Sequence, residues 1–237
     1  MIEALLPGDA VAVEAYDDAV PAPLFPEEER ALGDAVPKRR LEFATARRCA
    51  RSALAGLGFP AAPIPAGASR EPCWPPGVVG TITHCSGYRA AVVAWSKRLL
   101  TVGVDAEPHG PLPPGALESI ALDSEVRALS RLHEDVPGIH WDRLLFSAKE
   151  SVYKAWFPLA RRWLDFDSAV VTFDARARTF RARLLVPGPV VDGRKIIGFD
   201  GRWMVADGLV LTAIAVPALA RAAGYEREHA YGRVGVM

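Results

Sequence analysis

Residues 99–108 read Leu99-Leu100-Thr101-Val102-Gly103-Val104-Asp105-Ala106-Glu107-Pro108. The apolar run predicts a buried strand, and it ends in two carboxylates, Asp105 and Glu107. Alternate residues of a strand point to the same face, so both acids should project together. A hard cation such as Mg²⁺ would relieve their repulsion, because it takes oxygen ligands and is often held by one or two carboxylates plus substrate phosphates. The alternative is a strand that runs into an acidic turn at Pro108.

Bulk composition narrows the class of protein. The chain has 237 residues, which suits one large domain or two of about 120 residues each. Half of the residues are hydrophobic and 24% are charged, which is typical of a globular protein. Lys and Arg number 28, and Asp and Glu also number 28. Because the charges balance, we expect no nucleic-acid partner, and any anion site must be local.

Targeting and redox features favour the cytoplasm. The first residues lack the basic flank and apolar core of a signal peptide. No apolar run reaches the roughly 18 residues that a membrane span requires. Cys49, Cys73 and Cys85 are an odd number without CxxC spacing, so we expect reduced thiols and neither a disulfide nor a zinc site. We therefore expect a cytoplasmic protein that does not act at a membrane.

Helix and strand patterns alternate in the same order twice. The first part predicts a strand over 10–16, helices over 27–32 and 38–57, and strands over 78–85, 88–96 and 99–107. The second part predicts helices over 117–132 and 140–157, the latter stopped by Pro158, and strands over 169–173, 180–186, 202–205 and 209–216. Each part thus pairs one long helix with a group of strands.

This repetition predicts an α+β fold built as a pseudo-dimer of two similar halves, each a long helix packed on a small antiparallel sheet. We expect an N-terminal half over 1–108, a C-terminal half over 109–217, and a flexible tail over 218–237. If the three strands of the first half form a meander, its first and third strands end at the same rim. His84 and Asp105 would then lie close together.

The helix over 38–57 carries arginines beside its apolar stripe. At about 100° per residue, Arg39 and Arg47 flank the stripe, whereas Arg48 faces away from it. Guanidinium groups bind phosphate through pairs of parallel hydrogen bonds, so one interpretation is an anion site. The alternative is a solvated basic face of the helix.

The second long helix supplies a third carboxylate. Glu150 and Lys154 are four residues apart and share a face, while Lys149 lies about 100° away from Glu150. Taken alone, this is the common pattern of a surface ion pair. Bulky apolar residues flank the helix on most sides, and the Asp105-x-Glu107 pair lacks a third ligand. These two observations favour a polar strip that faces a cleft.

Together these residues predict a single site for Mg²⁺ and a pyrophosphate group. The metal neutralises phosphate oxygens, and the cations hold the remaining ones. Neither GxxxxGK[ST] nor GxGxxG occurs, which disfavours a P-loop or a Rossmann nucleotide site. The residues assembled in this way are Asp105, Glu107 and Glu150 as oxygen ligands, with Lys149, Lys154, Arg39, Arg47 and His84 around them.

With these residues in place, the sequence resembles the Sfp-type 4′-phosphopantetheinyl transferases, closest to the PptT-like and EntD-like branch. The matching blocks occur in the order of the family over about 38–164. They are Lys38-Arg39-Arg40-x-Glu42-Phe43-x-x-x-Arg47-x-Cys49-Ala50-Arg51, Glu71-Pro72-x-Trp74-Pro75, Gly80-Thr81-Ile82-Thr83-His84-Cys85-x-Gly87-Tyr88, Gly103-x-Asp105-x-Glu107, and Trp141-Asp142-Arg143 followed by Phe146-x-x-Lys149-Glu150-x-x-Tyr153-Lys154-Ala155-Trp156. Each block is weak alone, but the ordered set is specific.

The resemblance implies an enzyme that moves the phosphopantetheine arm of coenzyme A to a serine of an acyl or peptidyl carrier protein and releases 3′,5′-ADP. It implies that Asp105, Glu107 and Glu150 hold Mg²⁺. Glu150 would also take the proton of the carrier serine, directly or through a metal-bound water. Coenzyme A would lie in the cleft between the halves.

The resemblance also assigns the basic residues. Lys149 would meet the phosphate under attack and Lys154 the pyrophosphate. His84 and Arg39 would contact the 3′-phosphate, with Arg47 on the adenine side. The chain departs from its relatives at Ala66, where they carry a lysine, and Arg70 is the expected substitute.

Two other functions stay open at this point: a coenzyme A-binding regulator without transferase activity, and a Mg²⁺-dependent phosphohydrolase. The first would bind coenzyme A without transfer, and the second would release phosphate or adenylate without a carrier. Val126, Leu129 and Leu132 could receive the carrier protein, although packing against the second half explains them equally well. Because the family fold completes the site within one chain, we expect a monomer.

Overall fold

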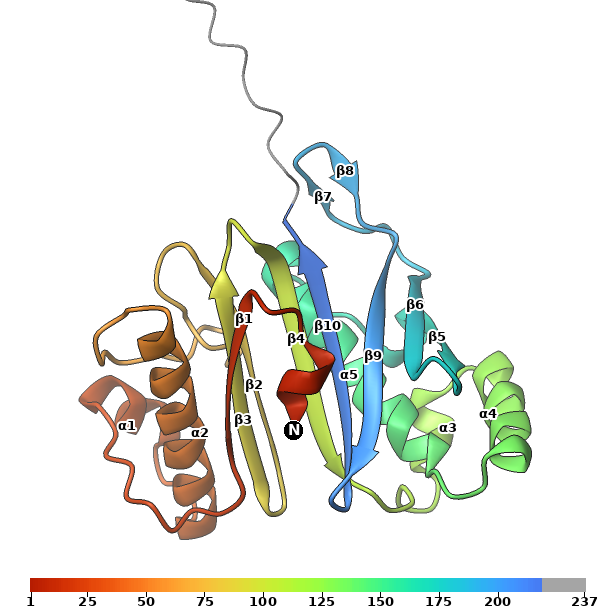
Figure 1. The fold of residues 1–237 in the computed structure, drawn as a ribbon, viewed down its shortest axis with the longest axis horizontal. Helices are drawn as coiled ribbons and strands as arrows, with labels where there is room; N and C mark the ends of the chain where they lie inside the picture. Colours follow the sequence, from red (N-terminus) through yellow and green to blue (C-terminus); the bar gives the residue numbers. More distant parts are fainter. Residues whose placement is uncertain (219–237) are drawn as a thin grey trace, which may run out of the picture.

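The computed structural model describes residues 1–218, so the tail expected over 218–237 lies, except for Ala218, outside the described residues. Figure 1 shows the N-terminal part as a three-stranded antiparallel sheet, ordered β1-β3-β2, with two helices beside it. The expected strand and both helices of this part are confirmed. Its elements are η1 (Ile2–Leu5), β1 (Ala10–Ala15), α1 (Pro26–Leu32), α2 (Pro37–Gly56), β2 (Val78–Cys85) and β3 (Tyr88–Trp95).

The second sheet has five antiparallel strands in the order β4-β10-β9-β6-β5. A short hairpin, β7–β8, projects from it (Figure 1). Its elements are β4 (Leu99–Pro108), α3 (Ala116–Ile120), α4 (Asp123–Asp135), α5 (Trp141–Ala160), η2 (Phe166–Ser168), β5 (Ala169–Asp174), β6 (Thr179–Leu184), β7 (Val190–Val191), β8 (Arg194–Lys195), β9 (Gly198–Ala206) and β10 (Leu209–Pro217).

The expected meander of the first half is wrong in its third strand. β4 does not pair with β3; its hydrogen-bonded neighbour is β10, with Asp105 opposite Thr212. Its other edge lies beside β2, where side-chain hydroxyls replace a backbone ladder. The hydroxyl of Thr83 accepts a hydrogen bond from the N–H of Ala106 at 3.1 Å. β4 is therefore the seam between the two sheets. It belongs to the five-stranded sheet, whereas the expected boundary at residue 108 groups it with the strands of the N-terminal half.

Two expected helix boundaries also change. The helix expected over 117–132 is two helices, α3 and α4, separated by extended residues at Ala121 and Leu122. Pro158 does not stop α5, which continues to Ala160. A proline in the last turn removes only one backbone hydrogen bond, and the helix ends instead at Arg161, which has a left-handed backbone (φ 51°).

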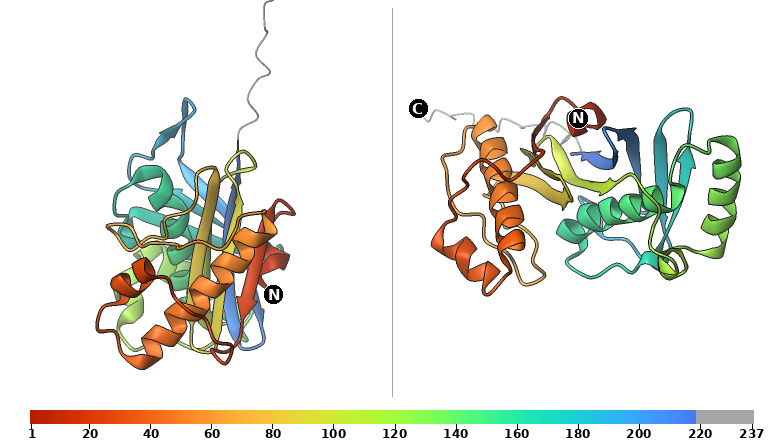
Figure 2. Two further views of the ribbon diagram at one scale, coloured as in Figure 1. Left: turned by 90° about the vertical axis from the view of Figure 1, so that its left-hand side faces the viewer. Right: turned by 90° about the horizontal axis from the view of Figure 1, so that it is seen from below.

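The two long helices each cover one sheet, and η1 lies on the face opposite α5, as the right-hand view of Figure 2 shows. Alternation along β4 follows this division. Val102 and Val104 pack in the cluster that includes η1, whereas Thr101 and Asp105 bond to α5. A side chain at Gly103 would overlap the backbone of α5 at Ser151, so this glycine allows the helix to approach the strand closely.

The structure is therefore α+β, with antiparallel sheets and one long helix on each of the two larger sheets. No helix in residues 1–218 is long and apolar enough to cross a lipid bilayer.

Candidate active site

Asp105 lies at the seam of the two sheets and is 4% exposed. Its Oδ1 accepts hydrogen bonds from Lys154 Nζ at 2.7 Å and from the Thr83 hydroxyl at 3.1 Å. Its Oδ2 is buried and has no hydrogen-bond partner among the described residues. A buried carboxylate oxygen without a partner is costly, so this atom is suited to a further cation.

Glu107 projects from the same face of β4, as the spacing predicts. Its Oε2 accepts a hydrogen bond from Arg143 at 3.2 Å. Burial, and then the charge of Asp105, raise the pKa of Glu107 to about 7, although Arg143 and Lys154 oppose the shift. When two neighbouring carboxylates are both ionised they repel each other, and a divalent cation bound between them would offset this repulsion.

Glu150 reaches the seam from α5. Burial raises the pKa of its carboxyl; Lys154 lowers it and Asp105 raises it by smaller amounts. Within residues 1–218, no hydrogen bond or ion pair engages the Glu150 carboxylate, whereas Asp105 and Glu107 each have a cation from α5. Glu150 is therefore the acid of the three that is available to accept a proton.

One stripe of α5 carries all of these partners. Arg143, Glu150 and Lys154 are spaced by seven and four residues, so they lie on one face of the helix. The sequence reasoning missed a role for Arg143, although this spacing was a usable signal. Arg143 also donates to the carbonyls of Gly110 and Pro111, and so ties the end of β4 to the start of α5.

Two cavities meet at Glu150. The first, which we call the seam pocket, has a volume of about 530 Å³ and lies between α5, β2 and the loop over 69–74. The second, the helix pocket, has a volume of about 130 Å³ and lies between α5 and the segment over 163–169. Glu150 and Tyr153 line both, so a long ligand could pass from one pocket to the other beside Glu150.

Arg39 and His84 lie together at the end of β2. Arg39 Nη1 and His84 Nε2 are 2.7 Å apart, so the ring nitrogen accepts and the proton resides on Nδ1. Desolvation, and then the charges of Arg39 and Lys154, lower the pKa of His84 to about 4, although its side chain still reaches solvent. A neutral histidine beside an exposed guanidinium can receive an anion.

Arg47 is 5% exposed, and its Nε has no hydrogen-bond partner among the described residues. Its guanidinium lies 4.4 Å from the ring centre of Phe43. Burial lowers the pKa of Arg47 to about 10, although the charge of Glu28 opposes the shift. A buried guanidinium without an ion pair is costly unless a ligand supplies the anion.

The loop over 66–74 forms one wall of the seam pocket. Arg70 lines the pocket from a left-handed backbone conformation (φ 65°), while Ala66 pairs with Pro72 at the base of the loop. Glu71 holds the turn by accepting the N–H of Ser69 and pairs with Arg161 of the other half at 3.5 Å. Arg70 therefore lies on the same loop as Ala66 and lines the pocket, and its role as the substitute basic contact stays a prediction.

Lys149 lies apart from the other expected residues. Its side chain is 3% exposed, and its Nζ donates to Glu125 Oε2 at 2.8 Å, to the Phe166 carbonyl at 2.6 Å and to the Ala169 carbonyl at 3.2 Å. Burial lowers the pKa of Lys149, and Glu125 opposes this shift. Glu125 could not be predicted as this partner, because nothing in the spacing of the two residues relates Glu125 to Lys149.

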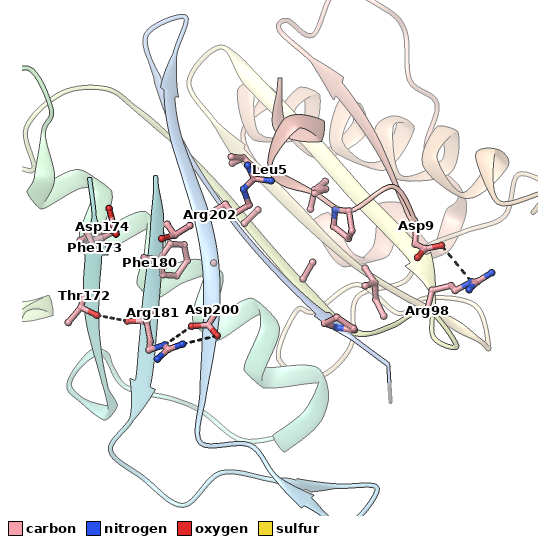
Figure 3. A pocket seen from close by; sticks show the side chains of 18 residues that line it. Leu5, Asp9, Arg98, Thr172, Phe173, Asp174, Phe180, Arg181, Asp200 and Arg202 are labelled. Atoms are coloured by element: carbon pink, nitrogen blue, oxygen red, sulfur yellow. Dashed lines mark hydrogen bonds and ion pairs between the residues drawn. The ribbon is translucent and has the colours of Figure 1, made fainter. Parts of the chain in front are cut away.

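A larger cavity, of about 790 Å³, lies on the η1 face of the sheets, away from these carboxylates (Figure 3). Its charged side chains are largely paired with one another: Arg181 with Asp200 at 2.7 Å, and Arg98 with Asp9 at 3.6 Å. Paired surface charges leave little capacity for a ligand, so size alone does not make this cavity the site.

A metal ion is compatible with the donors at the seam. No three Asp, Glu, His or Cys side chains in residues 1–218 converge closely enough to form a ready-made metal site. The unpartnered Oδ2 of Asp105 and the raised pKa values of Glu107 and Glu150 nevertheless mark a group of acids that is short of positive charge. All three offer the oxygen ligands that Mg²⁺ prefers.

The fold and the site define an enzyme of the group-transfer class that acts on a phosphorylated substrate. Comparison with known proteins makes this more specific. Residues 27–94 match the model of the 4′-phosphopantetheinyl transferase N-terminal domain, and residues 101–190 match that of the 4′-phosphopantetheinyl transferase superfamily.

Curated relatives agree over almost the whole chain. The 4′-phosphopantetheinyl transferase Svp of Streptomyces mobaraensis is 54% identical over 98% of this chain and 94% of its own. The transferase PptT of Mycobacterium tuberculosis is 46% identical over 88% and 92%. Enterobactin synthase component D of Salmonella typhi is more distant, at 36% over 62% and 60%. The chain belongs to the 4′-phosphopantetheinyl transferase superfamily and has that activity, which confirms the resemblance.

Proposed function

We propose that this enzyme transfers the 4′-phosphopantetheine arm of coenzyme A to a serine hydroxyl of an acyl or peptidyl carrier protein and releases 3′,5′-ADP. The observation that carries the proposal is the set of acids around Lys154: Lys154 pairs with Asp105, Glu107 lies two residues further along β4, and Glu150 lines both pockets. Family membership favours this reaction over a coenzyme A-binding regulator or a phosphohydrolase.

We assign Asp105, Glu107 and Glu150 as the ligands of Mg²⁺. When bound, the ion would neutralise charge on the pyrophosphate of coenzyme A and on the departing 3′,5′-ADP. Lys154 is the protein cation closest to these acids, so it would share the pyrophosphate. Arg143 would keep Glu107 oriented toward the site.

The pockets suggest how coenzyme A lies. The seam pocket is large and has Arg70 and Lys154 in its walls, so it suits the nucleotide end, and we assign Arg47 to the adenine side. Arg39 and His84 would receive the 3′-phosphate at the end of β2. The helix pocket is narrower, and Val152, Leu164 and Phe166 give it apolar walls that suit the pantetheine arm.

The chemistry requires a base at the junction of the pockets. Glu150 would accept the proton of the serine Oγ, which then attacks the phosphorus that carries the pantetheine arm. The P–O bond to 3′,5′-ADP breaks, and the negative charge that leaves on the nucleotide lies beside Lys154. The raised pKa of Glu150 makes it a stronger base than an exposed carboxylate.

Val126, Leu129 and Leu132, which the sequence suggested as a surface for the carrier protein, mostly pack against the second half. Leu129 is 6% exposed and Leu132 packs against the core of the second half, whereas Val126 stays 36% exposed beside a groove of about 520 Å³. Packing therefore accounts for two of the three residues. All proposed site residues come from one chain, so we propose that a monomer suffices.

The direct test is mass spectrometry of apo carrier proteins, acyl and peptidyl, after incubation with the enzyme, coenzyme A and Mg²⁺. We expect a gain of one phosphopantetheine group, localised to a serine. Nucleotide release without any change in the carrier would favour the phosphohydrolase. Tight coenzyme A binding without transfer to any carrier would favour the regulator.

A further inference from the structure

The Glu125–Lys149 pair forms a closed network inside the second half. Lys149 uses its three donors on Glu125, the Phe166 carbonyl and the Ala169 carbonyl. Glu125, which is 1% exposed, accepts from Lys149 and from the N–H groups of Leu122 and Val171, each at 2.7–2.8 Å. An ammonium has three hydrogens, so none is left for a phosphate.

This network joins the parts that build the helix pocket. Glu125 lies in the first turn of α4, Lys149 lies in the middle of α5, and Phe166 and Ala169 belong to the segment that leads into β5. Lys149, Phe166 and Ala169 all line the helix pocket beside Glu150. The pair therefore fixes the width of the pocket and the rotation of α5 that presents Glu150.

From this geometry we infer that Lys149 is a positioning residue, which acts through Glu125 to shape the helix pocket and to orient Glu150, and that it does not contact the phosphate under attack. The inference rests on the proposed function. Phosphate recognition then belongs to Lys154 and to the arginines of the first half.

Single variants distinguish the two roles. A phosphate contact would be replaced well by arginine and would not depend on Glu125. A buried three-donor site cannot hold the larger planar guanidinium, so we expect Lys149→Arg to be no better than Lys149→Met. We expect Glu125→Gln, although its side chain is remote from any phosphate, to lower kcat/KM for coenzyme A about tenfold or more, as Lys149→Met does.

The double variant Glu125→Met/Lys149→Met keeps the test valid if single variants are unstable. Removing one partner leaves a buried charge, whereas removing both restores an apolar interior. We expect its Tm to exceed that of either single variant, and its kcat/KM to be no lower than that of Lys149→Met. Glu28→Gln is the matched control, because Glu28 is also fully buried in an ion pair, with Arg51, and lines neither pocket. It should lower Tm and leave kcat/KM unchanged below the transition.

All variants are assayed for transfer from coenzyme A to an apo carrier protein at a temperature below every unfolding transition. A loss of 100-fold or more in Lys149→Met, with Lys149→Arg and Glu125→Gln within twofold of the parent, would overturn the inference and restore a phosphate contact. If the parent itself does not transfer, the proposed function fails instead, so the two failures are distinguishable.

Discussion

Lys154 Nζ lies 2.7 Å from Asp105 Oδ1, so a cation of the second long helix neutralises an acid of the strand at the seam between the sheets. The contact is partly buried, with Lys154 23% and Asp105 5% exposed. In the proposed complex Mg²⁺ would bind the same carboxylate, and Lys154 would turn to the pyrophosphate. The ammonium and the metal would therefore compete for Asp105 before coenzyme A binds.

This competition predicts the behaviour of Lys154→Met. Without Lys154, Asp105 has no counter-ion, so the metal-free variant should unfold at a lower Tm than the parent. Added Mg²⁺ should raise Tm more in the variant than in the parent, because no lysine must be displaced. Thermal unfolding with and without MgCl₂ measures both shifts. An equal Mg²⁺ shift in the two proteins would show that Lys154 and the metal do not share Asp105.

For Glu150→Gln we expect kcat to fall about 100-fold or more, the usual scale for the loss of an acid–base group. Affinity for coenzyme A in the absence of metal should change less than about threefold, because Gln keeps the shape of the side chain. Transfer assays and calorimetric titration measure the two quantities. Glu118→Gln, on an exposed face of α3, is the control and should match the parent. Near-normal turnover in Glu150→Gln would remove Glu150 from the role of base.

Glu107 should make the metal-free protein less stable as the pH rises. Its pKa in the folded state, about 7, lies above the usual value of 4.5, so its proton favours the folded state at low pH and this contribution is lost as pH rises through 7. Glu107→Gln should therefore increase the free energy of unfolding at pH 8 by up to about 3 kcal/mol and change it little at pH 5.

Urea unfolding in EDTA at the two pH values tests this, with the exposed Glu134→Gln as control. If Glu107→Gln instead increased the free energy of unfolding at pH 5 and not at pH 8, burial and Asp105 would not raise the pKa of Glu107. At saturating Mg²⁺, the free energy of unfolding of Glu107→Gln should no longer exceed that of the parent at pH 8.

Arg47→Met separates two effects of the buried guanidinium: its cost to the stability of the ligand-free protein and its contribution to coenzyme A binding. Removal of a buried guanidinium that has no ion pair with any residue of 1–218 should raise the Tm of the ligand-free protein. The same change should weaken coenzyme A binding by tenfold or more, because the ligand supplies the missing anion. Differential scanning calorimetry and binding titrations measure the two effects. A lower Tm together with unchanged coenzyme A affinity would make Arg47 a structural residue only.

Local patterns determined most of the helices and several strands correctly, because burial on one face leaves a periodic signal. The helix that became α2 and the strand that became β4 were visible in this way, and so was the shared face of Asp105 and Glu107. The place of β4 in the sheet could not be predicted in this way. Its pairing with β10 joins residues more than 100 positions apart, and no local pattern encodes such a pairing.

The site residues also fall into those that local spacing relates and those that only the fold brings together. Residues linked by spacing along one element, such as Glu150 and Lys154, were grouped correctly. Lys149 was grouped with them by proximity in sequence, but it lies about 100° around the helix, and its partner Glu125 comes from another helix. Only the fold shows which neighbour a buried lysine takes.

The most direct test of the account is a crystal structure of the enzyme with coenzyme A and Mg²⁺. We predict an ion ligated by Asp105, Glu107 and Glu150, with the nucleotide in the seam pocket, the pantetheine arm in the helix pocket and Lys154 on the pyrophosphate. Coenzyme A bound elsewhere, for example in the cavity on the η1 face, or a metal that engages none of the three carboxylates, would contradict it.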